Sequence, residues 1–392
     1  MRLLLALAAA LTIAATASAE PLAVKVGVLR QTHTRETLSI LDLPAENDAL
    51  AGALMGAADN NTTGKFTAQS FETIDLKLDE GEDAASALQK LADQGARLVI
   101  ADLDAQSLLA AADRAKALGA LIFNISAPDE NLREEDCRAQ IIHVAPSRAM
   151  LADALAQYLV WKRWPRWLLI KGSHGQDELL AAAYRASAKK FGAKIVEERV
   201  YEDLGGGRRS DSGSVQTQRQ MPLLTQSAPA YDVLVAADES EVFAGYLPYR
   251  TFDPRPVAGS AGLVPTSWDG AHEQWGAQQL QNRFMQMFHR AMNARDNNAW
   301  LAMRMIGEAA TRTKSDDPST LRAFLVSPDF SIAAFKGVRL SLRDWNQQVR
   351  QPILLSDGRM VASVSPQEGF LHQVTELDTL GHDRPETKCR LR

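Results

Sequence analysis

The sequence predicts an α/β protein of two lobes, each a mainly parallel β-sheet flanked by helices. Short apolar runs alternate with helical patterns of roughly 10–15 residues, which is the order of βαβ units around a sheet buried on both faces. About eight such strands precede residue 240, too many for one ordinary open sheet of this kind, so we expect two sheets. Hydrophobic residues make up 46% and charged residues 23% of the 392 positions, a composition that excludes a disordered, collagen-like or coiled-coil chain.

Residues 1–19 have the pattern of a cleaved export signal. Arg2 supplies the positive charge, residues 3–15 are apolar except for Thr12, and residues 17–19 (Ala-Ser-Ala) form the small-x-small site of signal peptidase. The run is shorter than the about 20 apolar residues of a membrane span, and no later stretch approaches that length. We therefore expect a soluble product exported to the periplasm, without membrane insertion, rather than a retained anchor. Glu20, in place of a cysteine after the cut, disfavours a lipid anchor.

The alternation of strands and helices runs through the first 240 residues. The strands are apolar runs without strict alternation, as in a sheet covered on both faces, and are expected at 24–29, 97–100, 120–123, 140–144, 167–170, 194–200 and 231–236. The helices have apolar residues three or four positions apart and are expected at 47–58, 83–93, 105–118, 147–161 and 176–190. Ser147 fits the N-cap of the fourth helix and Gly119 the C-cap of the third.

Residues 205–214 interrupt this alternation with three consecutive glycines followed by two arginines. Neither phosphate-binding glycine motif is matched, and we interpret the segment as a mobile surface loop rather than a nucleotide cradle. Beyond it, amphipathic helices are expected at 278–292 and 300–311. Strands follow at 337–342 and 352–364, the second turning at the hairpin signal Asp357-Gly358.

Charge and motifs exclude several classes of function. The formal charge is 43 − 48 = −5 with no cluster of Lys and Arg, so nucleic acid is not an expected partner. His272-Glu273 lacks the second histidine of a zinc-protease helix, and residues 172–175 (Gly-Ser-His-Gly) do not match G-x-S-x-G. We therefore expect binding rather than catalysis, and no required cofactor.

The cysteine content excludes a disulfide-dense scaffold and a zinc ribbon, because Cys137 and Cys389 are the only cysteines. In an exported protein they lie in an oxidising compartment, where a Cys137–Cys389 pair is expected. Two free or buried thiols are the alternative.

The order of export signal, strand 24–29, Gly- and Ala-rich helix 47–58 and repeated α/β units resembles the type I periplasmic substrate-binding proteins of ABC importers, the branched-chain amino-acid-binding group. The resemblance covers nearly all of the mature chain. Residues 122–132 (Ile-Phe-Asn-Ile-Ser-Ala-Pro-Asp-Glu-Asn-Leu) are similar to the strand and ligand loop of that family. More narrowly, the chain resembles the subgroup linked to PQQ-dependent alcohol dehydrogenase systems. The segments that carry this resemblance are Cys137-Arg138, residues 143–147, Trp268-Asp269-Gly270 and Cys389-Arg390.

The resemblance implies a type I periplasmic-binding-protein fold whose two lobes are joined by three crossovers. Lobe I would comprise residues 20–144 and about 257–334, and lobe II residues 145–256 and about 335–375. Residues 376–392 would return to lobe I, where the Cys137–Cys389 bridge would staple them. The implied function is the solute-binding component of an ABC importer, with its permease and ATPase as partners. The alternatives are a sensor or cofactor or metal chaperone for a quinoprotein dehydrogenase, and a conventional amino-acid-binding protein.

The candidate ligand-binding residues lie in loops at the carboxyl ends of the strands, where open α/β sheets bind ligands, and on the segment of the third crossover. They are Asp102, Asp104, Asn124, Ser126, Ala127, Asp129, Lys171, Ser173, His174, Asp238, Glu239 and Trp268. Two carboxylates after the strand at 97–100 would repel the α-carboxylate of an amino acid. This disfavours leucine-type binding, and an alcohol-derived solute is one candidate.

A cation is a second candidate. A lanthanide or calcium ion prefers several oxygen ligands, which Asp102, Asp104 and Asp129 could supply together with Glu130 and an acid of lobe II. A solvated acidic rim is the alternative, with Asp104 as the N-cap of the helix at 105–118.

The quinone cofactor PQQ, a flat anion with three carboxylates, is the opposing candidate. It would need cationic side chains and an aromatic plate, for which Arg30, Arg35, Arg133, Lys171 and Trp268 are available. Ordinary surface ion pairs for these cations, and packing of Trp268 within a crossover, are the alternatives.

Overall fold

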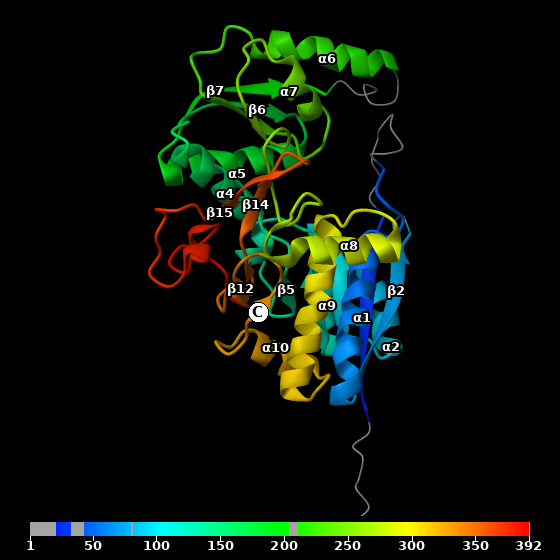
Figure 1. Cartoon of the computed structure of the whole chain (residues 1–392). Coiled ribbons are helices and arrows are strands. Elements are labelled where there is room, and N and C mark those ends of the chain that lie inside the picture. The colour runs from blue at the N-terminus through cyan, green and yellow to red at the C-terminus, as the bar shows by residue number, and fades with distance from the viewer. Residues whose placement is uncertain (1–20, 33–42, 80, 204–210, 392) are drawn as a thin grey trace, which may run out of the picture.

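The computed structural model of the chain describes residues 21–32, 43–79, 81–203 and 211–391 (Figure 1). The expected export signal at 1–19, Arg35 and most of the expected loop at 205–214 lie outside these residues. The end of that loop does not match the expectation, because helix α6 (Asp211–Thr225) already begins at residue 211. In the described part of the chain, no helix is both long and apolar enough to cross a membrane.

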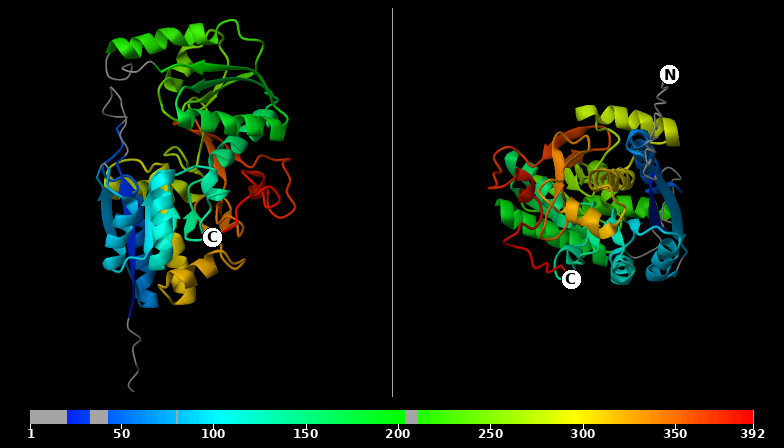
Figure 2. Two further views of the ribbon diagram at one scale, coloured as in Figure 1. Left: turned by 180° about the vertical axis from the view of Figure 1, so that it is seen from behind. Right: turned by 90° about the horizontal axis from the view of Figure 1, so that it is seen from below.

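Lobe I is built on a parallel sheet of five strands in the order β2-β1-β3-β4-β5. The strands are β1 (Leu22–Gln31), β2 (Gln69–Leu78), β3 (Leu98–Asp102), β4 (Leu121–Asn124) and β5 (Ile141–His143). On one face, Leu88 of α2 (Ala84–Asp93) and Leu108 of α3 (Ala105–Leu118) join a core with Leu29, Val99 and Ile122. The helices α1 (Leu50–Thr67) and α9 (Ala294–Thr313) cover the other face, as the front and rear views show (Figures 1 and 2).

Lobe II is built on a second parallel sheet, in the order β7-β6-β8-β9. Its strands are β6 (Arg166–Gly172), β7 (Lys194–Tyr201), β8 (Val233–Ala237) and β9 (Val257–Gly259). The helices α4 (Arg148–Trp161) and α5 (Gly175–Phe191) pack on one face. The other face is covered by α6, the short helix α7 (Leu247–Arg250) and the 3-10 helix η3 (Ala244–Tyr246). The predicted two-lobe α/β fold with parallel sheets is therefore confirmed.

The last third of the described chain returns to both lobes. Helices α8 (Ala277–Phe288), α9 and α10 (Pro318–Leu325) join the core of lobe I. Two small antiparallel sheets follow the orders β11-β12-β13 and β10-β14-β15. Their strands are β11 (Ile332–Ala333), β12 (Arg339–Leu342), β13 (Val349–Arg350), β10 (Val264–Thr266), β14 (Ile353–Ser356) and β15 (Val361–Ser365).

The boundaries between the lobes differ from the expected ones in two places. Strand β9 pairs with β8, so lobe II extends past residue 256. Leu340, Leu342 and Val349 are buried in the core of lobe I, so residues 335–350 do not belong to lobe II as expected. The reason is that the β11-β12-β13 sheet adjoins β5 through a bridge between His143 and Gln348. The chain therefore crosses between the lobes near residues 145–147, 267–276 and 351–352.

Helices α1 and α9 lie unusually close because two glycines of α1 face α9. A Cβ atom on Gly52 would lie 1.9 Å from the main-chain oxygen of Asp296, and one on Gly56 would lie 2.7 Å from the Cβ of Met303. Such close approach of two backbones is possible only without a side chain. The small residues noted in the sequence at 47–58 are thus a helix-packing surface, and the helix itself runs on to Thr67.

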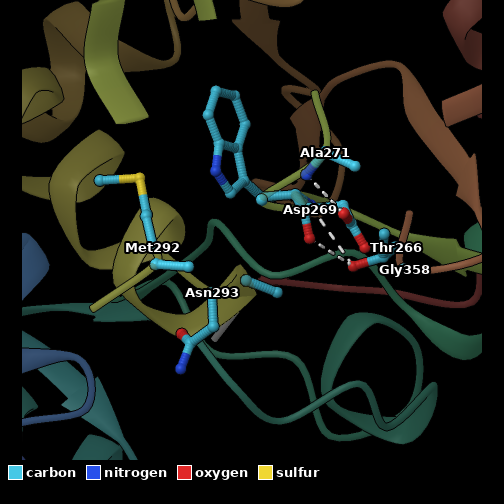
Figure 3. Close-up of a pocket in the computed structure, with 10 residues that line it drawn as sticks. Thr266, Asp269, Ala271, Met292, Asn293 and Gly358 are labelled. Carbon is cyan, nitrogen blue, oxygen red and sulfur yellow. Dashed lines mark hydrogen bonds between the residues drawn. The ribbon is translucent and has the colours of Figure 1, made fainter. Parts of the chain in front are cut away.

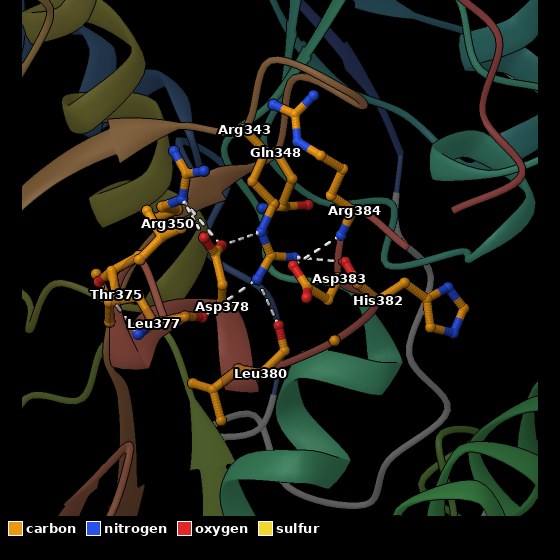
Figure 4. Close-up of polar contacts among 12 residues, drawn as sticks. Arg343, Gln348, Arg350, Thr375, Leu377, Asp378, Leu380, His382, Asp383 and Arg384 are labelled. Carbon is orange, nitrogen blue, oxygen red and sulfur yellow. Dashed lines mark hydrogen bonds and ion pairs between the residues drawn. The ribbon is translucent and has the colours of Figure 1, made fainter. Parts of the chain in front are cut away.

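Residues 376–389 form a C-terminal strap that contacts both lobes. Arg343 and Arg350, from the β12–β13 region, both bind the carboxylate of Asp378 at 2.9 Å (Figure 4). On the lobe II side, the amide of Gly381 donates to Asp153 of α4 at 2.8 Å. The strap ends on lobe I in a disulfide between Cys137 and Cys389, with an S–S distance of 2.11 Å. The expected pairing of the two cysteines is therefore confirmed.

Candidate functional site

The carboxyl ends of the lobe I strands point toward lobe II (Figure 1), and most of the candidate residues lie at these ends or at the corresponding ends in lobe II. Asp104 follows β3 and is the N-cap of α3, because its Oδ1 accepts the amide of Ser107 at 2.8 Å. Burial raises the pKa of Asp104, but the hydrogen bonds from Ser107 and Gln31 outweigh it and leave the pKa lowered. The helix-cap interpretation of Asp104 is confirmed.

The loop after β4 is a closed turn rather than an open ligand loop. The side chain of Asn124 is fully buried, and its Oδ1 accepts the amides of Ser126 and Ala127 while its Nδ2 donates to the Ala127 oxygen. Ser126 donates its hydroxyl to the oxygen of Leu103, which ties this loop to the end of β3. These residues fix the geometry of the edge of the sheet.

An ion-pair network joins the two lobes beside the first crossover. Arg148, at the start of α4, donates to Asp129 of lobe I at 2.9 Å and forms two bonds of 2.6 Å with Glu239, which follows β8. Burial lowers the pKa of Arg148, but the two carboxylates outweigh this effect and raise it. Asp129 and Glu239 are therefore brought together, as the sequence predicted. The cation between them is Arg148 of the protein and not a bound ligand.

The remaining lobe II candidates also have partners within the protein. Asp238 is buried and accepts the amides of residues 242–244, which closes the loop after β8. Burial raises its pKa against the effect of these bonds. Lys171 pairs with Glu178, and His174 lies 2.9 Å from the carboxylate of Asp203. Ser173 accepts the amide of Asp203.

The predicted metal site does not form among the residues that the structure describes. No three His, Cys, Asp or Glu side chains there are grouped so that they could hold a metal ion. Each of the three proposed ligands has a different partner. Asp104 caps a helix, Asp129 binds Arg148, and Asp102 faces the guanidinium of Arg295 at 3.7 Å. In this arrangement Asp102, Asp104 and Asp129 each have a separate partner and do not converge on one cation site.

The cations proposed for PQQ are similarly engaged. Arg30 forms two bonds of 2.8 and 2.7 Å with Asp75. Arg133 is fully buried and donates to Gln348 and to main-chain oxygens, and burial lowers its pKa to about 10. Lys171 is paired with Glu178, so all three cations already bind groups of the protein. None of them leaves its side-chain donors free to bind a carboxylate of a ligand.

A cavity of about 610 Å³ lies where three passes of the chain meet (Figure 3). Its wall comprises residues 266 and 268–271 of the second crossover, residues 291–294 between α8 and α9, and Gly358 at the tip of the β14–β15 hairpin. The crossover and the α8–α9 segment lead into lobe I, whereas β14 and β15 pack with lobe II. The cavity is therefore built from both lobes, and its volume is in the range of small-molecule sites.

The polar groups of the cavity wall are held by short-range hydrogen bonds. The hydroxyl of Thr266 donates to the oxygen of Trp268 at 3.0 Å, and the amide of Ala271 donates to the Oδ1 of Asp269 at 2.7 Å. Asn293 caps α9, the 20-residue helix that starts beside the cavity. Trp268 is nearly fully buried, and its ring meets that of His272 edge to face at 5.2 Å.

Of the candidate residues named from the sequence, Trp268 lines this cavity. It is also packed within a crossover, which was the alternative interpretation of this residue. Asp269 and Gly270 follow it in the sequence, and the three residues form one of the segments that carry the subgroup resemblance. The remaining lining residues were missed, because Met292, Asn293 and Gly358 carry no chemical motif. The only available signal was local: Asn293 has the pattern of a helix N-cap, and Gly358 belongs to a hairpin turn.

Comparison with known proteins agrees with this architecture. Residues 43–218 match the model of the family described as periplasmic binding protein. A periplasmic binding protein from Burkholderia mallei, 16% identical, superposes with a TM-score of 0.68 over 94% of this chain and 99% of that one. No curated protein matches the sequence.

Two further solved structures share the fold. A branched-chain amino acid ABC transporter ligand-binding protein from Burkholderia xenovorans LB400 is 16% identical, with a TM-score of 0.69 over 87% of this chain and 95% of that one. A solute-binding protein of an ABC transporter from Rhodopseudomonas palustris BisB5, in complex with 3,4-dihydroxybenzoic acid, is 13% identical, with a TM-score of 0.65 over 88% and 97%. The fold is therefore that of the type I periplasmic binding proteins.

Proposed function

We propose that the chain is the periplasmic solute-binding component of an ABC importer, which takes a small solute between its lobes and presents it to a permease and ATPase. The observation that carries the proposal is the cavity whose wall combines residues 266–271 and 291–294 with Gly358 of the hairpin. A solute there contacts both lobes at once. Such contacts favour the closed arrangement of the lobes, and the transporter reads that arrangement.

The work of this protein is then binding and closure without bond-making. Three crossovers connect the lobes, and the pairs of Arg148 with Asp129 and Glu239 lie beside the first of them. The neighbours of the fold are named for branched-chain amino acids and for 3,4-dihydroxybenzoic acid. A conventional amino acid is consequently a candidate solute, and the fold by itself does not select one.

We further propose that the protein serves a cell that oxidises alcohols with a quinoprotein dehydrogenase, and that it binds an alcohol-derived solute. The support is the sequence resemblance at Cys137-Arg138, residues 143–147, Trp268-Asp269-Gly270 and Cys389-Arg390. Of these segments, Trp268-Asp269-Gly270 contributes to the cavity wall, and the two cysteines are joined. PQQ itself fits less well as the cargo, because Arg30, Arg133 and Lys171 already have partners. A role as sensor or chaperone for the dehydrogenase is the alternative on the same fold.

The function is tested by blocking the cavity. Ala291 lines it and is exposed, so Ala291→Trp fills it, whereas Ala182→Trp places the same side chain on the exposed face of α5 as a matched control. We expect native mass spectrometry of the exported protein to find a bound solute in the wild type and in the Ala182 variant, and none in the Ala291 variant.

Small-angle scattering then measures closure. Adding the identified solute is expected to reduce the radius of gyration of the wild type and of the control but not of the blocked variant. A solute retained equally by the blocked variant, or scattering that never responds to it, would contradict the proposal. Solute-dependent capture of the dehydrogenase, with no transport defect in cells that lack the gene, would support the chaperone alternative.

A further inference from the structure

The charge of the cavity wall indicates which head group a solute carries. The ten lining residues are Thr266, Trp268, Asp269, Gly270, Ala271, Ala291, Met292, Asn293, Ala294 and Gly358. Among these described residues, Asp269 is the one charged side chain, and no lysine, arginine or histidine is present. A solute in the cavity therefore meets one negative charge and no positive side chain.

The carboxylate of Asp269 is held in place yet retains an open acceptor. Its main-chain oxygen accepts the amide of His272 and the Nε2 of Gln281, both at 3.0 Å, which fixes the backbone. Its Oδ1 accepts the amide of Ala271. Its Oδ2 has no hydrogen-bond donor among the residues that the structure describes. A carboxylate oxygen in this state accepts a bond from an ammonium or hydroxyl group.

The charged groups behind the wall do not reverse this preference. Arg290 is occupied by Asp296, with distances of 2.5 and 2.9 Å. Arg295 lies 3.7 Å from Asp102 and 3.9 Å from Asp48. These two guanidiniums thus face three carboxylates, and the layer behind the wall is not positive.

The start of α9 is the one feature that would favour an anion, since a helix N-terminus carries about half a positive charge. That partial charge is opposed by the carboxylate of Asp296 in the first turn of the same helix. The side chain of Asn293 accepts the amide of Asp296, and the carboxylate of Asp296 accepts the amide of Asn293. The capping box therefore binds these two amides from inside the chain.

The rest of the wall combines the polar side chains of Thr266 and Asn293 with three small alanines, and Trp268 and Met292 lie almost fully buried behind it. These residues bring no second charge into the cavity. We infer that the cavity selects a small solute with a hydrogen-bond-donating head group, an amine or an alcohol, over a carboxylate of the same skeleton. This inference rests on the proposed function, since it assumes that the cavity is the solute site.

The test uses three molecules that differ only in the head group: 3-methylbutylamine, 3-methylbutan-1-ol and 3-methylbutanoate, with leucine as a fourth probe. Titration calorimetry of the wild-type protein at pH 7 is expected to rank the amine first, the alcohol second and the carboxylate last. A like or unlike charge at about 4 Å in a water-like dielectric corresponds to about fivefold in Kd, and to more in a drier cavity.

Asp269→Asn keeps the shape and removes the charge. We expect it to weaken amine binding at least about fivefold, to change alcohol binding little and to improve carboxylate binding. Asp253→Asn, a half-buried aspartate on lobe II outside the cavity, is the matched control and should leave the ranking unchanged. Thermal melts of the two variants establish that both fold.

Three results would overturn the inference: tighter binding of the carboxylate or of leucine, an unchanged ranking in the Asp269 variant, or no binding of any probe. The proposed function survives such a result if the wild type copurifies with a solute and the Ala291→Trp variant does not. If that experiment fails as well, the proposed function fails with the inference.

Discussion

Lys336 offers a sharp test of the electrostatics of this fold. Its side chain is 1% exposed, and its Nζ donates to the Oε1 of Gln351 at 2.5 Å beside the third crossover. Burial lowers the pKa of Lys336 from 10.5 to about 7. Lys336→Met keeps an unbranched apolar chain of similar length and removes the titrating group.

The sign follows from the proton balance. Between pH 7 and 10.5 the unfolded chain holds a proton on this lysine that the folded chain does not, so the stability of the wild type rises with pH in this window. The slope is about 1.4 kcal/mol per pH unit. At pH 7, where the folded group is half protonated, the buried lysine therefore costs about 4 kcal/mol, an upper value, and at pH 9 about 2 kcal/mol. The variant lacks this slope, although it leaves the Oε1 of Gln351 unpaired at a cost of about 1–3 kcal/mol.

The assay is denaturant unfolding of both proteins at pH 7, 8 and 9, followed by circular dichroism and by tryptophan fluorescence. The stability of the Lys336 variant relative to the wild type is expected to fall by about 2 kcal/mol from pH 7 to pH 9, whatever the Gln351 contribution. Lys65→Met, at an exposed lysine of α1, is the control and should show no such trend. A difference that stays constant across the three pH values would refute the reasoning.

Three further substitutions test other features. Gly52→Ala is expected to destabilise the fold by about 3 kcal/mol in chemical unfolding, because its Cβ would meet the backbone of α9, whereas Gly245→Ala, with open space around it, should be near neutral. Replacing both Cys137 and Cys389 by Ala opens a loop with a sequence separation of 252, and loop entropy predicts a loss of up to about 5 kcal/mol, measured against the wild type without reductant. Asp104→Ala should lower the melting temperature through the loss of a helix cap worth about 1 kcal/mol, and calorimetry should find solute affinity unchanged. Equal stability of the cysteine variant, or a large loss of affinity on replacing Asp104, would contradict these assignments.

The fold was largely predictable because its central strands are buried on both faces. Such strands contain continuous apolar runs, as at 98–101 and 233–237, and they are hard to mistake. Strand β2 was missed because it lies at the edge of its sheet, and most of its residues are exposed or half-buried. Strands β11 and β13 have two residues each, too few to produce a pattern. Helix α6 was missed altogether, because the glycine-rich segment before it is typical of a loop.

The site was less predictable, for a physical reason. Polar residues after a buried strand can bind a ligand or close the turn, and composition does not separate the two. Asn124 and Asp238 close turns by accepting backbone amides, and Asp104 caps a helix. The cavity instead forms where segments far apart in sequence meet, so its small residues, such as Ala291 and Gly358, have no signal of their own.

The close packing of α1 against α9 has a consequence for folding during synthesis. A chain that emerges from its N-terminus presents α1 and all five strands of the first sheet early, whereas α9 follows only after the four-stranded sheet of lobe II. During that interval the glycine-lined surface of α1 lacks its partner helix. Lobe II is incomplete as well, because Ile353, Leu355 and Leu380 of its core follow α9. Partly synthesised molecules therefore expose apolar surface of both lobes, and holding chaperones and proteases would act on them at this stage.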